Sequence, residues 1–249
     1  MTKTTHKSSG FADLGISPAI LNQLNKLNFN TPTPIQHRAI PIAIGGQDLM
    51  GIAQTGTGKT AAFVLPILHL LSTEIKSIEP NSPLVLVLSP TRELAMQIDK
   101  TFERFGKHLK IKHTAIFGGV SQEPQIKILS KGIQVLTATP GRLLDLISHD
   151  KVNLSSVEYI VLDEAHTYRG VFGSHVSLIL RRLLRICKVA GADPIIAASS
   201  ATIANLEPYG FTARRVISLI LYFERSATNF QSPLPNKSNK NNLSKQCSA

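Results

Sequence analysis

The residues with the clearest potential for chemistry form the stretch "AQTGTGKT" at 53–60, between an apolar run and a helix-like segment. Gly56 and Gly58 would allow backbone N–H groups to point inward around phosphate oxygens. Lys59 is placed to reach the β- and γ-phosphates of a nucleotide, and the Thr60 hydroxyl is placed to ligate Mg²⁺. The first position of the stretch is alanine, where the strict pattern has glycine. The spacing predicts a phosphate loop, and a glycine-rich turn without a ligand is the alternative.

A second candidate group is "VLDEAH" at 161–166. Asp163, at a strand end, can hold the Mg²⁺ shell, and Glu164 can orient and deprotonate an attacking water. Two acids at a strand end are often only a solvated turn, so the prediction of hydrolysis depends on their sharing a face with the phosphate loop. His166 is either a coupling residue or a local hydrogen-bonding group.

Six apolar, β-branched runs supply strands that could position these residues. Several are apolar on both faces, as a parallel sheet covered by helices requires. The expected strands are 48–53, 84–89, 113–117, 133–138, 159–163 and 194–199. Helical patterns occur at 60–71, 91–109, 141–149 and 174–190. This alternation predicts a doubly wound α/β domain with a mostly parallel sheet and helices on both faces.

A polar cluster follows each expected strand. In chain order the clusters are "AQTGTGKT", "SPTREL", "GG", "TPGR", "DEAH" and "SAT". Folds of this class bind ligands at the carboxyl ends of their strands. One edge of the sheet is therefore predicted to be the active face.

The charge balance indicates an anionic partner. The chain has 249 residues, 43% of them hydrophobic, and a formal net charge of +11. Nucleic acid is the first candidate for the partner and a membrane surface the second. The alternative is that part of the charge only solvates the chain, notably the lysines at 237, 240 and 245.

Cysteine usage and hydropathy point to a soluble protein of a reducing compartment. Cys187 and Cys247 are the two cysteines, which suggests neither a disulfide framework nor a metal cluster, so we expect a cytoplasmic location. The first fifteen residues have no apolar region typical of a signal peptide. The run "VISLILYF" at 216–223 is too short to cross a bilayer, so no membrane partner is expected.

Together the motifs carry a family resemblance. "FADLGISPAILNQLNKLNFNTPTPIQ", "AQTGTGKT", "PTRELA", "GG", "TPGR" and "SAT" resemble the first RecA-like domain of a DEAD-box RNA helicase, particularly of bacterial members. The likeness covers roughly residues 11 to 162. It implies a RecA-like P-loop fold that uses ATP and Mg²⁺ and binds single-stranded or structured RNA.

The resemblance implies an adenine site ahead of the phosphate loop. Gln36 resembles the glutamine that reads adenine, with Phe29 packing on the base and Phe11 supporting it. A glutamine amide offers a donor and an acceptor, which suits the N6 and N7 edge of adenine. Without the resemblance, Gln36 would be read as a helix-surface residue. The likeness also assigns the loop residues Thr55 and Thr57 to nucleotide binding.

Further positions resemble the family's contacts to nucleic acid. Those expected to touch the sugar–phosphate backbone are Thr91, Arg92, Gly118, Gly119, Thr139 and Arg142. Ser200 and Thr202 resemble the "SAT" residues that couple hydrolysis to strand separation, and a polar strand end is the alternative. Backbone contacts of this kind are salt-sensitive and largely independent of sequence.

The likeness changes after the fifth expected strand. The DEAD-box pattern has Asp-Glu-Ala-Asp, but this chain reads "DEAHTYRGVFGSHVSLILRRLLRIC", which is similar to bacterial DExH helicases that act on DNA in repair. This suggests a join between two related helicase cores and leaves DNA open as a partner. "RRLLRIC" is either a basic nucleic-acid stripe or a buried amphipathic helix with solvated arginines.

The expected organisation is a flexible segment 1–10, a RecA-like domain 11–207, an uncertain extension 208–231 and a disordered polar tail 232–249. No arginine-finger pattern of a second RecA-like domain follows residue 207, so such a domain could act in trans.

We therefore expect the ATP-binding core of an RNA helicase. The alternative is a truncated or chimeric ATP- and RNA-binding module without productive hydrolysis or unwinding. The "PTREL", "TPGR" and "SAT" set argues against a small-molecule kinase.

Overall fold

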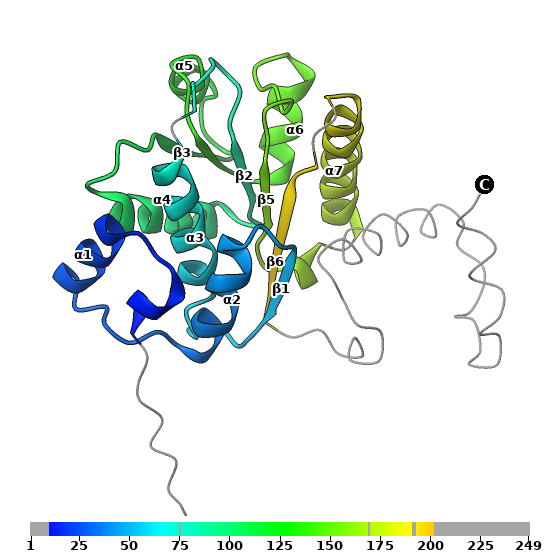
Figure 1. Cartoon of the computed structure of the whole chain (residues 1–249). Helices are drawn as coiled ribbons and strands as arrows, with labels where there is room; N and C mark the ends of the chain where they lie inside the picture. Colours follow the sequence, from blue (N-terminus) through cyan, green and yellow to red (C-terminus); the bar gives the residue numbers. More distant parts are fainter. Residues whose placement is uncertain (1–9, 75, 169, 191–192, 202–249) are drawn as a thin grey trace, which may run out of the picture.

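The computed structural model describes residues 10–74, 76–168, 170–190 and 193–201 (Figure 1). Six strands in this part of the chain form one sheet in the order β1-β6-β5-β2-β4-β3, and every neighbouring pair is parallel. Their bounds are β1 Leu49–Ile52, β2 Val85–Leu88, β3 His113–Ile116, β4 Val135–Ala138, β5 Tyr159–Leu162 and β6 Ile195–Ser200. All six expected strands are confirmed, with ends that differ by one or two residues.

The described residues also form seven α-helices and two 3-10 helices, of which the first three helical elements precede β1. Their bounds are η1 Phe11–Leu14, α1 Pro18–Lys26, α2 Pro34–Ile44, α3 Lys59–Thr73, α4 Arg92–Gly106, α5 Glu123–Leu129, α6 Pro140–Ser148, η2 Ala165–Thr167 and α7 Gly170–Ala190. The four expected helices correspond to α3, α4, α6 and α7. The helices α1, α2 and α5 were not among them.

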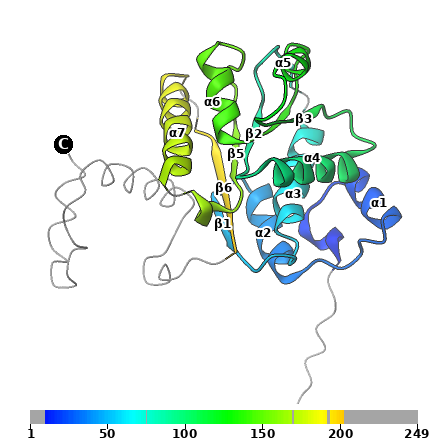
Figure 2. The same cartoon turned by 180° about the vertical axis from the view of Figure 1, so that it is seen from behind.

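Two hydrophobic layers cover opposite faces of the sheet. Val85 and Val87 of β2 pack with α1 to α4, whereas Leu86 and Leu88 pack with α6 and α7. Successive strand residues point to opposite faces, so a strand buried on both sides is apolar at every position. Figure 1 shows the sheet between these two groups of helices, and Figure 2 shows the same arrangement from behind. The predicted α/β class with helices on both faces is confirmed.

The segment after β5 packs on the same sheet face as α6. Leu183 and Cys187 of α7 are buried in that layer, whereas Arg182 and Arg185 are exposed. The hydroxyl of buried Tyr168 donates a hydrogen bond of 2.8 Å to the carbonyl of Leu88. "RRLLRIC" is therefore part of an amphipathic helix with Arg182 and Arg185 on its exposed side, and its role as a nucleic-acid stripe stays a prediction.

None of the helices among the described residues is long and apolar enough to cross a membrane. The expected segments 208–231 and 232–249 lie outside the described residues, as do residues 1–9 and the coupling candidate Thr202.

Candidate nucleotide and nucleic-acid sites

The strand order sorts the candidate residues into two adjacent groups along one edge. β1, β6 and β5 lie side by side and are followed by the phosphate loop, the "SAT" residues and the acidic pair. β2, β4 and β3 form the other half of the sheet and are followed by "PTREL", "TPGR" and "GG". The candidate nucleotide residues thus follow one half of the sheet, called here the nucleotide half, and the candidate RNA residues follow the other, called the nucleic-acid half.

Backbone pairing continues one residue past the strands at this edge, which fixes where the loops begin. The amide of Ala53 donates to the carbonyl of Ser200 at 3.1 Å, and that of Asp163 donates to Leu88 at 2.9 Å. The amide of Thr139 donates to Ile116 at 3.0 Å. The polar side chains therefore start from a rigid row of paired backbone.

The phosphate loop has the backbone that its glycines permit. Gly56 has φ +84° and Gly58 has φ +87°, both in the left-handed region. Thr57 closes the turn, since its hydroxyl donates to the carbonyl of Gln54 at 2.7 Å. A Cβ atom added at Gly56 would meet no heavy atom within 4 Å, so the backbone there borders open space. Exposed, inward-turned backbone next to a helix N-terminus suits phosphate oxygens.

Lys59 closes this loop from inside. Its Nζ donates a hydrogen bond of 2.7 Å to the carbonyl of Ala53, the first residue of the loop. The same Nζ lies 3.5 Å from Oε1 of Glu164, and both side chains are largely buried. Lys59 is the first residue of α3 and Thr60 the next, so their side chains start from the N-terminal turn of that helix.

Asp163 lies buried at the end of β5. Its Oδ1 accepts a hydrogen bond of 2.8 Å from the hydroxyl of Ser199, and its Oδ2 lies 3.5 Å from that of Ser89. Burial raises the pKa of the Asp163 carboxyl, and the charge of Glu164 adds to this. The Ser199 hydrogen bond and, more weakly, the Lys59 charge lower that pKa. The Ser199 hydrogen bond and the Lys59 charge thus compensate only part of the cost of burying the negative charge of Asp163.

Glu164 links the phosphate loop to the end of β6. Its backbone has φ +48°, and its Oε2 is buried without a hydrogen-bond partner among the described residues. Oε2 lies 3.4 Å from Nδ1 of His166, which in turn lies 3.1 Å from the hydroxyl of Ser200. A continuous polar path therefore runs from Lys59 through Glu164 and His166 to Ser200.

The donor set at this end of the sheet fits a Mg²⁺ ion bound with ATP. Carboxylate and hydroxyl oxygens are the ligands that Mg²⁺ prefers, and Asp163 and Thr60 would supply them. The under-compensated Asp163 carboxyl suits a site that receives a cation, and so does Oε2 of Glu164, which is buried without a hydrogen bond among the described residues. Among the described residues, three or more His, Cys, Asp or Glu side chains do not gather into a separate metal cluster.

Gln36 is held between α2 and the phosphate loop. It is fully buried, so its interpretation as a helix-surface residue is wrong. Its Oε1 accepts a hydrogen bond of 3.0 Å from the amide of Thr33, and its Nε2 donates to the carbonyl of Gly58 at 3.1 Å. A Cβ at Gly58 would lie 2.3 Å from that Nε2. Gln36 is therefore in direct contact with the phosphate loop at Gly58.

The two aromatic residues assigned to the adenine site stack on each other. The rings of Phe11 and Phe29 are 5.4 Å apart and inclined by 27°, and Phe29 also lies 5.4 Å from the ring of Phe105. Phe11 is buried and Phe29 half-buried. Phe29 is therefore supported by Phe11 and Phe105 and remains partly exposed, and its packing on a base stays a prediction.

The nucleic-acid half is organised around the exposed "GG" loop. Arg142 donates through Nη2 to the carbonyl of Val120 at 2.9 Å, which ties α6 to this loop. The guanidinium of Arg92 lies 4.9 Å from the centre of the Phe117 ring, a cation–π contact. Gly118 and Gly119 are exposed, and Gly119 has φ +78°.

The other two residues of this half begin helices. Thr91 precedes α4 and its Oγ1 accepts a hydrogen bond of 3.2 Å from the amide of Leu94, whereas Thr139 precedes α6. The structure thus brings together all six residues expected to contact nucleic acid, along neighbouring strand ends.

Several residues that shape the site were not expected. Ser199 and Ser89 contact the Asp163 carboxyl, Phe117 supports Arg92, and the carbonyl of Val120 anchors Arg142. Ser199 and Ser200 are consecutive strand residues, so they face opposite sides of the sheet, one toward Asp163 and the other toward His166. The two consecutive serines in "AASSAT", at the end of an expected strand, were the sequence feature that could have indicated Ser199.

The six-stranded parallel sheet with helices on both faces is that of a RecA-like P-loop domain. A model of the DEAD/DEAH box helicase family matches residues 33–208, and the chain belongs to this family. The matched range continues past Leu162, through the point where the sequence departs from the DEAD-box pattern.

Several similar proteins are known. The chain is 45% identical over 155 residues to DEAD-box ATP-dependent RNA helicase 20 of Arabidopsis thaliana, and 46% over 156 residues to ATP-dependent RNA helicase dbp2 of Schizosaccharomyces pombe. It is 44% identical over 162 residues to ATP-dependent RNA helicase DeaD of Buchnera aphidicola. These matches cover 62%, 62% and 65% of this chain, and 31%, 28% and 26% of the relatives. The chain thus spans less than a third of the length of these curated relatives.

Proposed function

We propose that this chain is the ATP-binding and RNA-contacting core of an ATP-dependent RNA helicase. The single observation that carries the proposal is the arrangement of one sheet edge, where the nucleotide group on β1, β6 and β5 lies beside the nucleic-acid group on β2, β4 and β3. The names of the relatives support ATP and RNA as the ligands. In such a core, ATP hydrolysis drives remodelling of the bound nucleic acid.

Nucleotide binding uses the loop and the segment before it. Backbone amides between Thr55 and Gly58 receive the phosphates, and Lys59 exchanges its bonds to Ala53 and Glu164 for phosphate oxygens. Thr60 and Asp163 would hold Mg²⁺, which would supply charge neutralisation at the phosphates. The adenine packs on Phe29 and is read by Gln36, whose buried amide already contacts the loop.

Hydrolysis depends on Glu164. Once Lys59 turns toward phosphate, the Glu164 carboxylate is free to accept a proton from an attacking water. His166 and Ser200 then connect the state of that carboxylate to the end of β6. This path is the proposed basis for coupling, and Thr202, which lies outside the described residues, stays a sequence-based candidate for the same role.

RNA binding uses the second half of the edge. The backbone of a single strand lies across the "GG" loop and the two helix N-termini that begin near Thr91 and Thr139, with Arg92 and Arg142 contributing charge. Helix N-termini and exposed glycine backbone bind phosphates without reading sequence. Affinity should therefore fall steeply with salt.

Productive turnover requires an arginine contact to the γ-phosphate from a second RecA-like domain. The loop 53–60 and the segment 163–167 contain no arginine, and Arg92 and Arg142 belong to the RNA half. Arginine fingers contribute about 10³- to 10⁵-fold to turnover where they operate. We propose that this contact is supplied in trans to the residues described here.

The decisive experiment is a titration of the purified chain with Mg·ATP, alongside ATP turnover with and without single-stranded RNA. We expect Lys59→Ala to weaken ATP binding by at least about tenfold, because a charged hydrogen-bonding group is lost. Lys127→Ala, at an exposed lysine of α5, is the matched control and should bind normally. Adding a second RecA-like domain should raise turnover of the wild type but not of Lys59→Ala.

The same assay separates the alternatives. ATP and RNA binding with no turnover, even with the added domain, would favour a binding module without productive hydrolysis. A parallel titration with single-stranded DNA tests the likeness of the segment after Leu162 to DExH DNA helicases. Failure to bind Mg·ATP would contradict the proposed function.

A further inference from the structure

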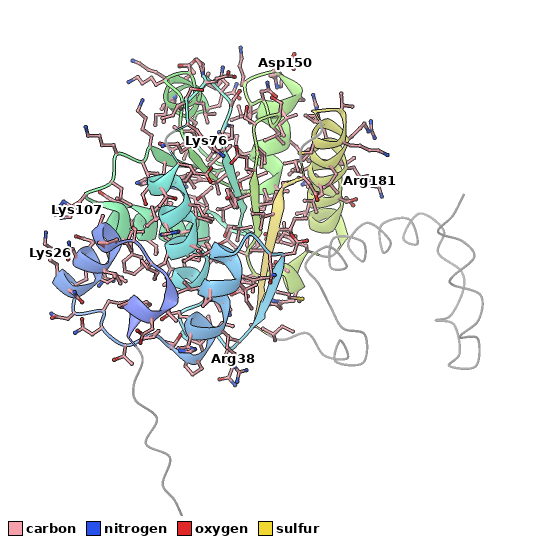
Figure 3. All side chains as sticks on the ribbon, in the orientation of Figure 1. Lys26, Arg38, Lys76, Lys107, Asp150 and Arg181 are labelled. Atoms are coloured by element: carbon pink, nitrogen blue, oxygen red, sulfur yellow. The ribbon has the colours of Figure 1, made fainter. Side chains whose placement is uncertain are left out.

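A group of basic side chains lies at the end of α4 opposite to Thr91 and Arg92. It comprises Lys26, Arg104, Lys107, His108, Lys110 and Lys112, and is called here the α4 basic cluster. All six side chains are exposed. Figure 3 labels Lys26 and Lys107, which lie near each other on the outer side of the helical layer. None of these residues belongs to the nucleotide or RNA groups described above.

The cluster is built from separate parts of the chain. Lys26 ends α1, and its Nζ lies 3.4 Å from Nε2 of His108, 82 residues further on. The two helices are joined beside this contact, because Nε2 of Gln23 donates to the carbonyl of Arg104 at 2.8 Å. Folding therefore brings the Lys26 side chain, from a separate helix, to the end of α4.

The chain that leaves α4 adds two more lysines. Leu109 and Ile111 pack against the hydrophobic core, so Lys110 and Lys112 project to the outside. This extended segment is fixed by a hydrogen bond of 2.7 Å from the amide of Lys112 to Oε1 of Gln134. The lysines thus extend from a well-anchored backbone.

The charges of the cluster are not neutralised locally. Within the described ranges, none of its members forms an ion pair with a carboxylate. Asp99 is bound to His113 at 2.7 Å, and Glu103 is the one acidic residue between positions 100 and 113. Stabilisation of the α4 C-terminus accounts for Arg104 and Lys107 but not for lysines on other segments.

We propose that the α4 basic cluster is a second binding surface for the phosphate backbone of RNA. It extends the proposed RNA binding, on which it rests, to a region outside the sheet edge. The 15 residues of α4 span about 22 Å, so a long strand can contact both ends of the helix and a very short one cannot. The surface would hold RNA without regard to sequence and increase the affinity for long strands.

The test compares two variants that each lose four positive charges. Lys26, Lys107, Lys110 and Lys112 are changed to Gln in the cluster variant, and the equally exposed Lys127, Lys131, Lys151 and Lys188 in the control. Affinity is measured as a function of salt for single-stranded RNA of about 5 and about 25 nucleotides. Acetylation of lysines in the wild-type chain, with and without the long RNA, reports the same surface without any substitution.

We expect the cluster variant to bind the long RNA about tenfold or more weakly, with a salt slope reduced by about 3. Its affinity for the short RNA should match that of the wild type, and the control should lose less than threefold on either RNA. Long RNA should protect Lys107, Lys110 and Lys112 from acetylation.

Equal losses in both variants would overturn the proposal, since they would reflect net charge alone. Unprotected cluster lysines, or cluster-dependent binding to anionic lipid vesicles but not to RNA, would also overturn it. Failure of short RNA to bind any form would instead contradict the proposed RNA edge.

Discussion

Lys59 Nζ lies 3.5 Å from Oε1 of Glu164, so the lysine of the phosphate loop and the proposed water-activating carboxylate neutralise each other. The same Nζ donates to the carbonyl of Ala53 at 2.7 Å. Both groups are largely buried, so the pair keeps two charges compensated until phosphate arrives. Under the proposed function, we expect nucleotide binding to Lys59 to release Glu164 at the same time.

Glu164→Gln should separate binding from turnover. Without the carboxylate, Lys59 keeps its bond to Ala53 and meets no anionic competitor for phosphate, so Mg·ATP affinity should be unchanged or up to severalfold higher. Turnover with RNA and an added second domain should fall about 10²- to 10⁴-fold, because the general base is lost. Titration with a fluorescent ATP analogue and a phosphate-release assay measure the two quantities. Glu123→Gln, an exposed carboxylate on α5, is the control, and a loss of affinity like that of Lys59→Ala would contradict the interpretation.

Asp163→Asn should stabilise the nucleotide-free fold. Burial raises the pKa of Asp163 above its ordinary value of 3.8. A carboxyl with a raised folded-state pKa favours folding below the unfolded pKa, and this contribution is lost as pH rises through the folded pKa. The amide keeps an acceptor for Ser199 and gains a donor toward Ser89. At neutral pH we expect a gain of about 1 kcal/mol, or about 2–4 °C in Tm.

Thermal unfolding with and without Mg·ATP measures both consequences of this change. The stabilisation of the wild type by Mg·ATP should be largely absent in Asp163→Asn, since a proposed Mg²⁺ ligand is removed. Ser199→Ala should have the opposite effect on the nucleotide-free protein, because it removes the hydrogen bond that supports the charged carboxyl. A lower Tm for Asp163→Asn would show that its polar contacts outweigh the burial of its charge.

Gly58→Ala should damage the loop far more than Gly56→Ala. Both positions have positive φ, so each alanine costs about 1–2 kcal/mol. A Cβ at Gly58 would also lie 2.3 Å from Nε2 of Gln36, whereas one at Gly56 meets nothing within 4 Å. We expect Gly58→Ala to abolish ATP binding and to lower the free energy of unfolding more than Gly56→Ala does.

Chemical unfolding of the two alanine variants, and of each combined with Gln36→Ala, isolates this contact. The coupling energy between positions 36 and 58 should be about 1–3 kcal/mol, and that between 36 and 56 near zero. Equal destabilisation by the two alanines would mean that the loop moves away from Gln36 at little cost.

The sheet and the positions of its polar loops could be predicted because both depend on local sequence. β2 is apolar at every position and β4 at every position but Thr137, and the motifs directly follow the strands. α2 contains Pro41 in its interior and α5 has seven residues with a proline in its first turn, so neither shows a clear helical pattern. The hydrophobic periodicity of a helix needs several turns to be recognised.

The contacts within the site could not be predicted, because they depend on the strand order. β6 lies between β1 and β5, which brings Ser199 to Asp163 and Ser200 to His166. The sequence places these residues more than thirty positions apart and gives no sign of which strands are neighbours. The burial of Gln36 and the Lys59–Glu164 pair likewise arise only from packing.

Arg142→Lys should weaken RNA binding through loop position rather than through charge. Arg142 donates from Nη2 to the carbonyl of Val120 at 2.9 Å. A lysine is shorter and lacks the planar guanidinium, so it cannot reproduce this hydrogen bond. We expect RNA affinity to fall about fivefold with an unchanged salt slope, because the charge is kept. Arg142→Gln should lower both the affinity and the slope. Fluorescence anisotropy over a range of salt concentrations measures both, and a reduced slope for Arg142→Lys would indicate a direct phosphate contact.

His69→Asn should make the fold less sensitive to acid. Nδ1 of His69 accepts a hydrogen bond of 3.1 Å from the amide of Ser17, which fastens the start of α1 to α3. Burial lowers the pKa of His69 from its ordinary 6.5, so its contribution to stability is complete above that pH and is lost as pH falls toward the folded-state pKa. An asparagine oxygen can accept the same hydrogen bond and does not titrate. In His69→Gln the side chain is one carbon longer, so its oxygen no longer meets the Ser17 amide, and losing this hydrogen bond costs about 1 kcal/mol of stability. Urea unfolding between pH 5 and 8 should therefore give a flatter stability profile for His69→Asn than for the wild type, and a uniformly lower one for His69→Gln. Parallel profiles for the wild type and His69→Asn would show that protonation of this imidazole does not break the contact between α1 and α3.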